Sequence, residues 1–142
     1  MSMRKRLSFF MACLTLCFAV LPTGTAAANT QLSVMPRMTY IKDADCTLTI
    51  NGNSASVYAY VNGYANTATN CEVTVELQER SLLFFWDTVE TWSVEEAGQH
   101  ATISQTASVT SSTTYRAVAT VTVWSGSQSE TQTLTSETFK AP

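Results

Sequence analysis

The 142-residue sequence is poor in the residues on which most catalytic and metal sites depend. It contains one histidine, His100, and five glycines. A Ser–His–carboxylate triad would have to use that one histidine, and a metal centre needs more ligands than His100, Cys46 and Cys71 can supply. The sequence shows no glycine-rich loop that could cradle a phosphate. These absences argue against an enzyme and predict neither a metal nor a cofactor.

Charged residues are also scarce, at 13%, and basic ones are the scarcer kind. Three of the eight basic residues lie at positions 4–6, so residues 29–142 hold five basic against eleven acidic side chains, a net charge of −6. Nucleic acids and anionic membranes are bound through basic faces. The charge balance therefore disfavours both of these partners.

The acidic side chains form no recognisable catalytic or calcium-binding set. Asp43 and Asp45 match no dedicated calcium loop, and they are expected in a solvated turn. The glutamates of the strand-like segments are expected to face outward instead of forming the carboxylate pair of a glycosidase. These outward positions are Glu72, Glu76, Glu90 and Glu130.

The first 28 residues are predicted to be a secretory signal peptide. Met1–Arg6 carries three positive charges, Leu7–Leu21 is an apolar run of fifteen residues, and Ala26–Ala28 offers a cleavage site of small residues. This is the order of parts that a signal peptide requires, and the apolar run is shorter than the roughly 20 residues that span a bilayer. We expect cleavage near Ala28, no stable membrane insertion, and a secreted, extracellular product.

Two cysteines, Cys46 and Cys71, follow the predicted cleavage site. Both share the phase of the apolar residues around them, so both thiols are expected to point inward. An exported domain with two cysteines favours one disulfide, which would close a loop of about 25 residues and contribute roughly 3–4 kcal/mol. Two buried free thiols are the alternative.

The remainder of the chain reads as strands and turns. Period-two alternation, β-branched residues and turn dipeptides such as Asn51-Gly52 are the signals. The expected strands are 46–51, 54–62, 71–79, 82–92, 101–109, 115–124 and 130–138, with a short opening strand around Met38–Ile41. Turns are expected at 79–81, 95–98 and 125–127.

Seven to eight short strands with turns every 8–12 residues predict an antiparallel β-sandwich. Tyr115-Arg116-Ala117 resembles the tyrosine corner of the immunoglobulin fold, with alanine where antibody domains place a cysteine. We therefore expect residues 29–142 to form one all-β, immunoglobulin-like domain. A jelly roll or a small open barrel is the alternative.

The chain also resembles small exported proteins of Gram-positive bacteria that consist of one Ig-like domain. Four stretches carry the resemblance: Met35–Ile41 (MPRMTYI), Leu77–Arg80 (LQER), Leu82–Trp86 (LLFFW) and Thr114–Ala117 (TYRA). The resemblance implies an Ig-like fold and an exported bacterial protein. It brings no catalytic residue with it.

One apolar segment, Leu82–Trp86, exceeds what a sandwich core requires. It is apolar in both strand phases, although a two-layer sandwich buries only one phase of each strand. We expect one phase to face the core and the other to be exposed, unless loops or residues 29–44 cover these rings. The predicted binding surface consists of Phe84, Phe85, Trp86 and Trp92 with the outward-facing Tyr58 and Tyr60.

Together these patterns predict a secreted, non-enzymatic recognition domain. The leading hypothesis is binding to a protein at a cell surface, or self-association, through the Leu82–Trp92 hairpin, because aromatic rings give large contact areas at low entropic cost. A carbohydrate-binding module that uses the same rings on a cell-surface glycan is the second hypothesis. A small antibacterial or inhibitory polypeptide is the third.

Overall fold

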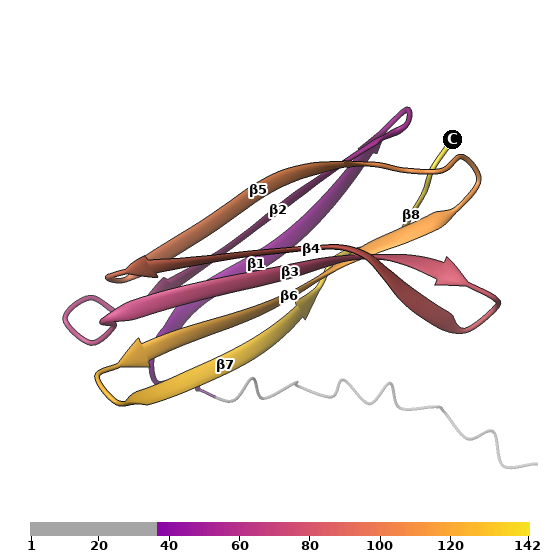
Figure 1. Ribbon diagram of the computed structural model, residues 1–142. Coiled ribbons are helices and arrows are strands. Elements are labelled where there is room, and N and C mark those ends of the chain that lie inside the picture. The colour runs from indigo at the N-terminus through magenta and orange to yellow at the C-terminus, as the bar shows by residue number, and fades with distance from the viewer. Residues whose placement is uncertain (1–36) are drawn as a thin grey trace, which may run out of the picture. The chain divides into compact units, whose positions relative to one another are not determined.

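The computed structural model of the protein describes residues 37–142, and all regular elements among them are β-strands (Figure 1). The eight strands are β1 (Ile41–Asn51), β2 (Ser54–Gly63), β3 (Asn70–Ser81), β4 (Phe85–Ala97), β5 (His100–Ser108), β6 (Thr114–Ser125), β7 (Gln128–Thr135) and β8 (Phe139–Lys140). The predicted signal peptide, residues 1–28, lies outside the described residues.

The strands form two antiparallel sheets packed face to face (Figure 1). One sheet has the order β1-β2-β5, and the other has the order β4-β3-β6-β7, with β8 also pairing with β6. The chain passes from one sheet to the other after β2, β4 and β5. The predicted antiparallel sandwich of seven to eight strands is confirmed.

The core between the sheets is built almost entirely from small and β-branched side chains. Inward positions alternate with outward ones along the central strands, so the pattern seen in the sequence is also the burial pattern. The buried positions of β2, β3 and β6 are Ala55, Val57, Ala59, Val61, Cys71, Val73, Val75, Leu77, Ala117, Ala119, Val121 and Val123. Tyr115 is the one aromatic side chain that is fully buried within residues 37–142.

Tyr115, at the start of β6, makes two hydrogen bonds to other segments of the chain. Its hydroxyl accepts the backbone N–H of Thr110 at 2.9 Å and donates to Oε2 of Glu79 at 3.4 Å. A buried tyrosine that bonds the backbone a few residues upstream is the arrangement of a tyrosine corner. Through Glu79 the same hydroxyl also contacts β3 close to the point where the β3–β4 hairpin leaves the sandwich.

The chain approaches β1 along β7. The carboxylate of Glu130 accepts the backbone N–H groups of Thr39, Tyr40 and Ile41 at 2.9, 2.7 and 2.9 Å. The predicted opening strand around Met38–Ile41 is therefore wrong, since within residues 37–142 the first strand begins at Ile41. Glu130 is also not the outward, solvated residue that was predicted, because the segment before β1 folds over it.

The predicted disulfide between Cys46 and Cys71 is not formed, and both residues are buried free thiols. Both point inward, as predicted. The thiol of Cys46 lies against the backbone of Ala119, whereas Cys71 lies opposite Val123. Those two positions of β6 are four residues, or about 13 Å, apart, while a disulfide needs Cα atoms within about 7 Å.

The position at which β1 begins explains why the disulfide prediction is wrong. A bridge at one end of the sandwich required each cysteine to stand at the start of its strand. Cys71 does so, but β1 begins at Ile41 and places Cys46 in the middle of the strand. The alternative of two buried thiols is the one that the structure has.

Candidate functional site

The β3–β4 hairpin continues beyond the body of the sandwich. β3 pairs with β6 only as far as Glu79, which lies opposite Tyr115 near the start of β6. Its last two residues, Arg80 and Ser81, pair with β4 alone. The end of the hairpin therefore has no third strand beside it, and it projects to the right in Figure 1.

The chain reverses direction at Leu82–Phe84 and not at residues 79–81 as predicted. Residues 79–81 continue β3 and pair with β4. Leu82 takes a φ of 49°, in the left-handed region that favours glycine or asparagine and strains a leucine. The turn was missed because turns are normally made by Gly, Pro, Asn, Asp or Ser, and positions 82–84 hold none of these.

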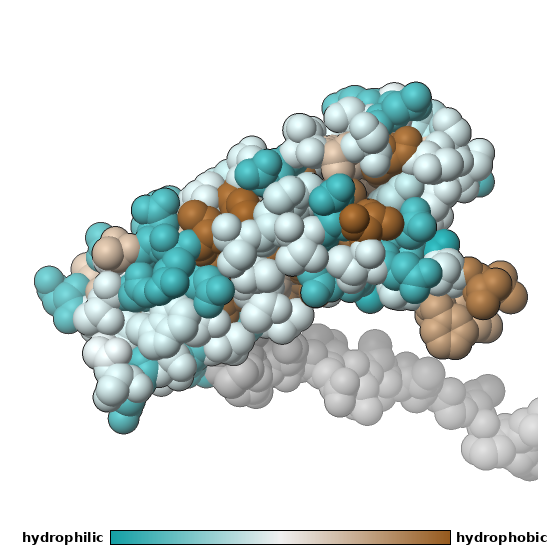
Figure 2. Space-filling model, viewed as in Figure 1, coloured by the Kyte–Doolittle hydropathy of each residue, from teal (hydrophilic) through white to brown (hydrophobic). Residues whose placement is uncertain are grey.

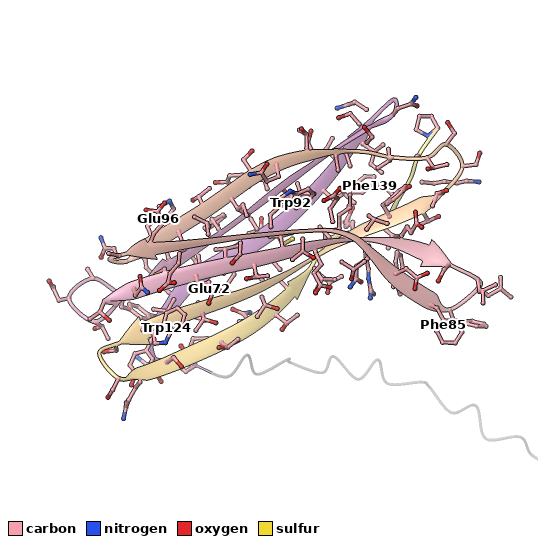
Figure 3. The ribbon with its side chains drawn as sticks, in the orientation of Figure 1. Glu72, Phe85, Trp92, Glu96, Trp124 and Phe139 are labelled. Atoms are coloured by element: carbon pink, nitrogen blue, oxygen red, sulfur yellow. The ribbon has the colours of Figure 1, made fainter. Side chains whose placement is uncertain are left out.

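Four consecutive large apolar side chains form what we call the hairpin tip, Leu82–Phe85. In chain order they are 82%, 80%, 83% and 64% exposed. The expectation that one phase would face the core is wrong, because the turn lies beyond the sandwich and neither phase reaches the core. Figure 2 shows the hairpin tip as a brown projection at the lower right, and Figure 3 labels Phe85 there.

Trp86 lies directly behind the hairpin tip, beside two arginines. The Cζ atoms of Arg80 and Arg116 are 4.9 and 4.2 Å from the centre of its ring, within the range of a cation–π contact. Nε of Arg116 also donates to Oε1 of Gln78 at 2.9 Å, which holds this guanidinium in place. The sequence analysis missed both arginines. Arg116 belongs to β6, and only the pairing of β3 with β6 brings it to the hairpin.

A β-bulge separates Trp86 from the other predicted ring of this hairpin, Trp92. β4 carries one extra residue, Val89, which has no partner in β3. An extra residue in one strand makes the side chains beyond it point to the opposite face of the sheet. Trp92, labelled in Figure 3, lies opposite Val75 and packs, partly buried, against the core. At the rise of a β-strand, it is about 20 Å along β4 from Trp86. Trp92 is therefore not part of the hairpin tip.

The two predicted tyrosines lie on the other sheet, on the outer face of β2. Tyr58 is 43% exposed and Tyr60 is half-buried, while Ala59 between them is buried, so the predicted outward phase is confirmed. Their ring centres are 6.0 Å apart and the planes are tilted by 47°. Burial, followed by the charges of Asp43 and Asp45, raises the pKa of Tyr60. The tilted rings form no flat platform, and they lie on a different sheet from the hairpin tip.

The other polar residues singled out by the sequence do not converge on a reactive centre. Nδ1 of His100 is 2.6 Å from Oδ1 of Asn62, and Nε2 is 2.7 Å from Oγ1 of Thr102. Asp43 and Asp45 lie within β1 and not in the predicted turn. Residues 37–142 contain no cluster of three or more His, Cys, Asp or Glu side chains arranged to hold a metal ion.

Comparison with protein-family models and with curated proteins finds no match. Among solved structures, the chain is similar to the sporulation control protein Spo0M of Bacillus subtilis, with 13% identity, a TM-score of 0.41, and coverage of 70% of this chain and 50% of that chain. It is also similar to CsgH of R. palustris, with 16% identity, a TM-score of 0.32, and coverage of 66% and 90%. The chain thus spans about half the length of Spo0M. Likenesses this distant carry no functional argument.

Proposed function

We propose that this protein is a secreted, non-enzymatic recognition domain whose contact surface is the hairpin tip. The observation that carries the proposal is the exposure of four consecutive large apolar side chains on a projection outside the core. Contiguous exposed apolar groups on a soluble domain mark contact sites for other molecules. The sandwich serves as the rigid scaffold, and a short segment between two of its strands makes the contact.

The composition of the core supports this assignment. Phe84, Phe85 and Phe139 are the phenylalanines of the described residues, and all three are exposed. The core is filled by valine, alanine, leucine and isoleucine, so it does not need the rings of the hairpin tip to reach native packing density. Contiguous exposed rings that the core does not need are available for contact with another molecule.

The backbone at Leu82 supports the same assignment. Holding a leucine in the left-handed region costs roughly 1–2 kcal/mol. Strain of this kind gathers at functional sites, where the surrounding structure keeps it in place. Asparagine or glycine would make the same turn without strain, so the leucine is best explained by its apolar side chain.

The predicted signal peptide and the resemblance to exported Ig-like domains of Gram-positive bacteria support a location outside the cell. We therefore place the partner at a cell surface. No enzymatic role is proposed, because both ring nitrogens of His100 lie within hydrogen-bond distance of neutral side chains, Asn62 and Thr102.

The test compares three forms of the fluorescently labelled protein on intact bacterial and mammalian cells: the wild type, a tip variant (Phe84→Ser/Phe85→Ser) and a tyrosine variant (Tyr58→Ser/Tyr60→Ser). We expect the tip variant to bind at least tenfold more weakly and the tyrosine variant to bind within about twofold of the wild type. The free energy of unfolding of the tip variant should change by only about 0.5 kcal/mol, because the removed rings are exposed.

The reverse pattern, in which only the tyrosine variant loses binding, would favour the carbohydrate-binding hypothesis, and a glycan array would then identify the sugar. Equal binding by all three folded forms would refute the hairpin tip as the contact surface.

A further inference from the structure

We infer that the hairpin tip inserts into the interface of a zwitterionic phospholipid bilayer, with Arg80 and Arg116 against the phosphates of the headgroups. This inference rests on the proposed function and names the partner. It concerns reversible attachment through a few side chains. Residues 37–142 contain no helix that is long and apolar enough to cross a membrane.

The shape of the hairpin tip is the first argument. Its side chains lie at or beside a turn that projects from the sandwich, and each of the four is at least 64% exposed. A flat protein surface could cover one side of such a projection and would leave the others in water. A bilayer interface can surround it on all sides, and four large apolar side chains then leave water together.

The order of residues behind the hairpin tip is the second argument. Apolar side chains come first, and the next row holds Trp86 opposite Arg80. The guanidinium of Arg116 reaches the same indole ring from β6, two rows farther back, opposite Gln78. Tryptophan favours the boundary between headgroups and acyl chains, and arginine makes strong hydrogen bonds to phosphate. The sequence of apolar, indole and cationic groups along the hairpin therefore follows the sequence of layers in a phospholipid leaflet.

The acidic residues lie farther back. Glu79 and Asp87 pair with each other one row beyond Arg80 and Trp86, on the opposite face of the hairpin. The first charges behind the apolar residues are therefore positive, although the domain as a whole is acidic. A net negative charge would be repelled by an anionic bilayer, so a zwitterionic lipid such as phosphatidylcholine, which offers a phosphate without a net charge, is the better match.

A second copy of the chain is the main competing occupant, and the grooves on the described surface carry charged side chains. One groove contains Asp45 and Glu137 beside the apolar Cys46, Leu48 and Phe139. Another contains Lys42 and His100. The recesses beside Tyr64 include Arg37. Burying apolar side chains against these charged and polar groups would remove the groups from water without giving them a hydrogen-bond partner.

The experiment measures the partition of the purified protein into unilamellar vesicles of phosphatidylcholine by co-sedimentation. The tip variant (Phe84→Ser/Phe85→Ser) should partition at least tenfold more weakly than the wild type. The matched control is Tyr58→Ser/Tyr64→Ser, which removes two rings that are 43% and 42% exposed at other places and should stay within about twofold of the wild type. All forms begin at Asn29, the predicted start of the exported chain, and differ only at the substituted positions, so the comparison isolates the hairpin tip.

A second measurement reports insertion directly. Replacing Trp92 and Trp124 by Phe leaves Trp86 as the one tryptophan of the chain. Its emission should shift to shorter wavelength on adding vesicles and should be quenched by lipids brominated on the acyl chain. Raising the salt from about 0.1 to 1 M should weaken partition by less than about twofold, because apolar transfer is not screened.

Partition that is equal for the wild type and the tip variant, or no partition by either, would overturn the lipid inference. If the tip variant then still fails to bind cells, the proposed function stands with a protein as the partner. If sedimentation velocity shows self-association that the tip variant abolishes, the occupant is a second copy. If the tip variant changes none of these measurements, the proposed function falls as well.

Discussion

Leu82 shows at the scale of one residue how the hairpin tip combines strain with exposure. It is the first residue of the turn, has a positive φ, and leaves 82% of its surface in water. Neither property stabilises the folded chain. If the hairpin tip is the contact surface that we propose, substitutions at this position should affect stability and binding in opposite directions.

We expect Leu82→Asn to stabilise the protein and to weaken its binding. Asparagine tolerates the left-handed region, so relief of strain should add about 1 kcal/mol and raise the Tm by about 5 °C. Leu83→Asn is the matched control, because Leu83 is similarly exposed but its φ is not positive. Thermal unfolding measures the first effect and vesicle partition the second. Equal Tm shifts in the two variants would contradict the role of the backbone.

The two thiols should be nearly inert in the folded protein. Burial, together with the charge of Asp45, raises the pKa of Cys46 to about 11, and burial raises the pKa of Cys71. The thiolate is the reactive form, so a short pulse of iodoacetamide at neutral pH should label neither residue until the chain is unfolded. Peptide mapping measures the labelling. Detection of a peptide in which Cys46 is linked to Cys71 in a non-reduced digest would show that the two residues form a disulfide and would contradict the prediction.

At the scale of elements, the fold depends on contacts between segments far apart in the sequence. Glu130 on β7 holds the segment before β1 by three backbone hydrogen bonds. Burial alone would raise the pKa of its carboxyl, but the N–H donors of Ile41, Thr39 and Tyr40 outweigh burial and lower it. The ionised form is therefore the one that the fold favours.

Glu130→Gln should lower the free energy of unfolding by about 1 kcal/mol, less than is usual for hydrogen bonds to a charged group, because this carboxylate is partly solvated. The pKa of Glu130 is lower in the folded than in the unfolded state, so the ionised carboxylate stabilises the fold at pH values above the unfolded pKa of about 4.3. This stabilisation is lost as the pH falls through the pKa of the folded state. Chemical denaturation at pH 7 and pH 3 should show the difference shrinking at low pH. Glu137→Gln, at an exposed position, is the control and should have no such effect.

Gly63 at the end of β2 is required for close packing. A Cβ at this position would overlap the Cβ of Ala68 and lie 2.9 Å from Cγ1 of Val123. Gly63→Ala should therefore cost about 1–3 kcal/mol of unfolding free energy, as overpacked cores do. Adding Ala68→Gly removes the first overlap and should recover part of the loss. Unchanged stability of the single variant in urea denaturation would rule out the close contact.

At the scale of the whole molecule, the free energy of unfolding depends on the core of the sandwich and hardly on the side chains of the hairpin tip. The core lies between the two sheets, and the hairpin tip lies outside it on the extension of β3 and β4. Substitutions of Leu83, Phe84 or Phe85, whose φ angles are not positive, should therefore leave the stability of the whole fold nearly unchanged. This separation allows the contact surface to be altered while the scaffold is kept.

The location of the molecule is open to a direct test. We expect the intact mass of protein collected from culture medium to correspond to a chain that begins at or near Asn29. Changing Leu14 and Leu16 to Asp should block export, because a charged apolar region no longer works as a signal peptide. A species in the medium that still begins at Met1 would contradict the predicted cleavage.

Local alternation in the sequence determined the strands and their inner faces. β2, β3 and β6 lie within about two residues of their predicted bounds, because a strand that buries one face must alternate with period two. The inward direction of both cysteines and the outward direction of Tyr58 follow from the same rule. These features depend on near neighbours in the chain, so one sequence is enough to predict them.

Tertiary structure decided how far the strands run and which of them meet. The turn at Leu82, the bulge at Val89, and the contact of Arg116 with Trp86 depend on the register between strands. So does the distance that keeps Cys46 from Cys71. Register is set by the pairing of segments distant in sequence, and a shift of one residue changes which side chains meet without changing the alternation. For this reason the sequence indicated an aromatic surface, and only the fold placed it at a tip backed by two arginines.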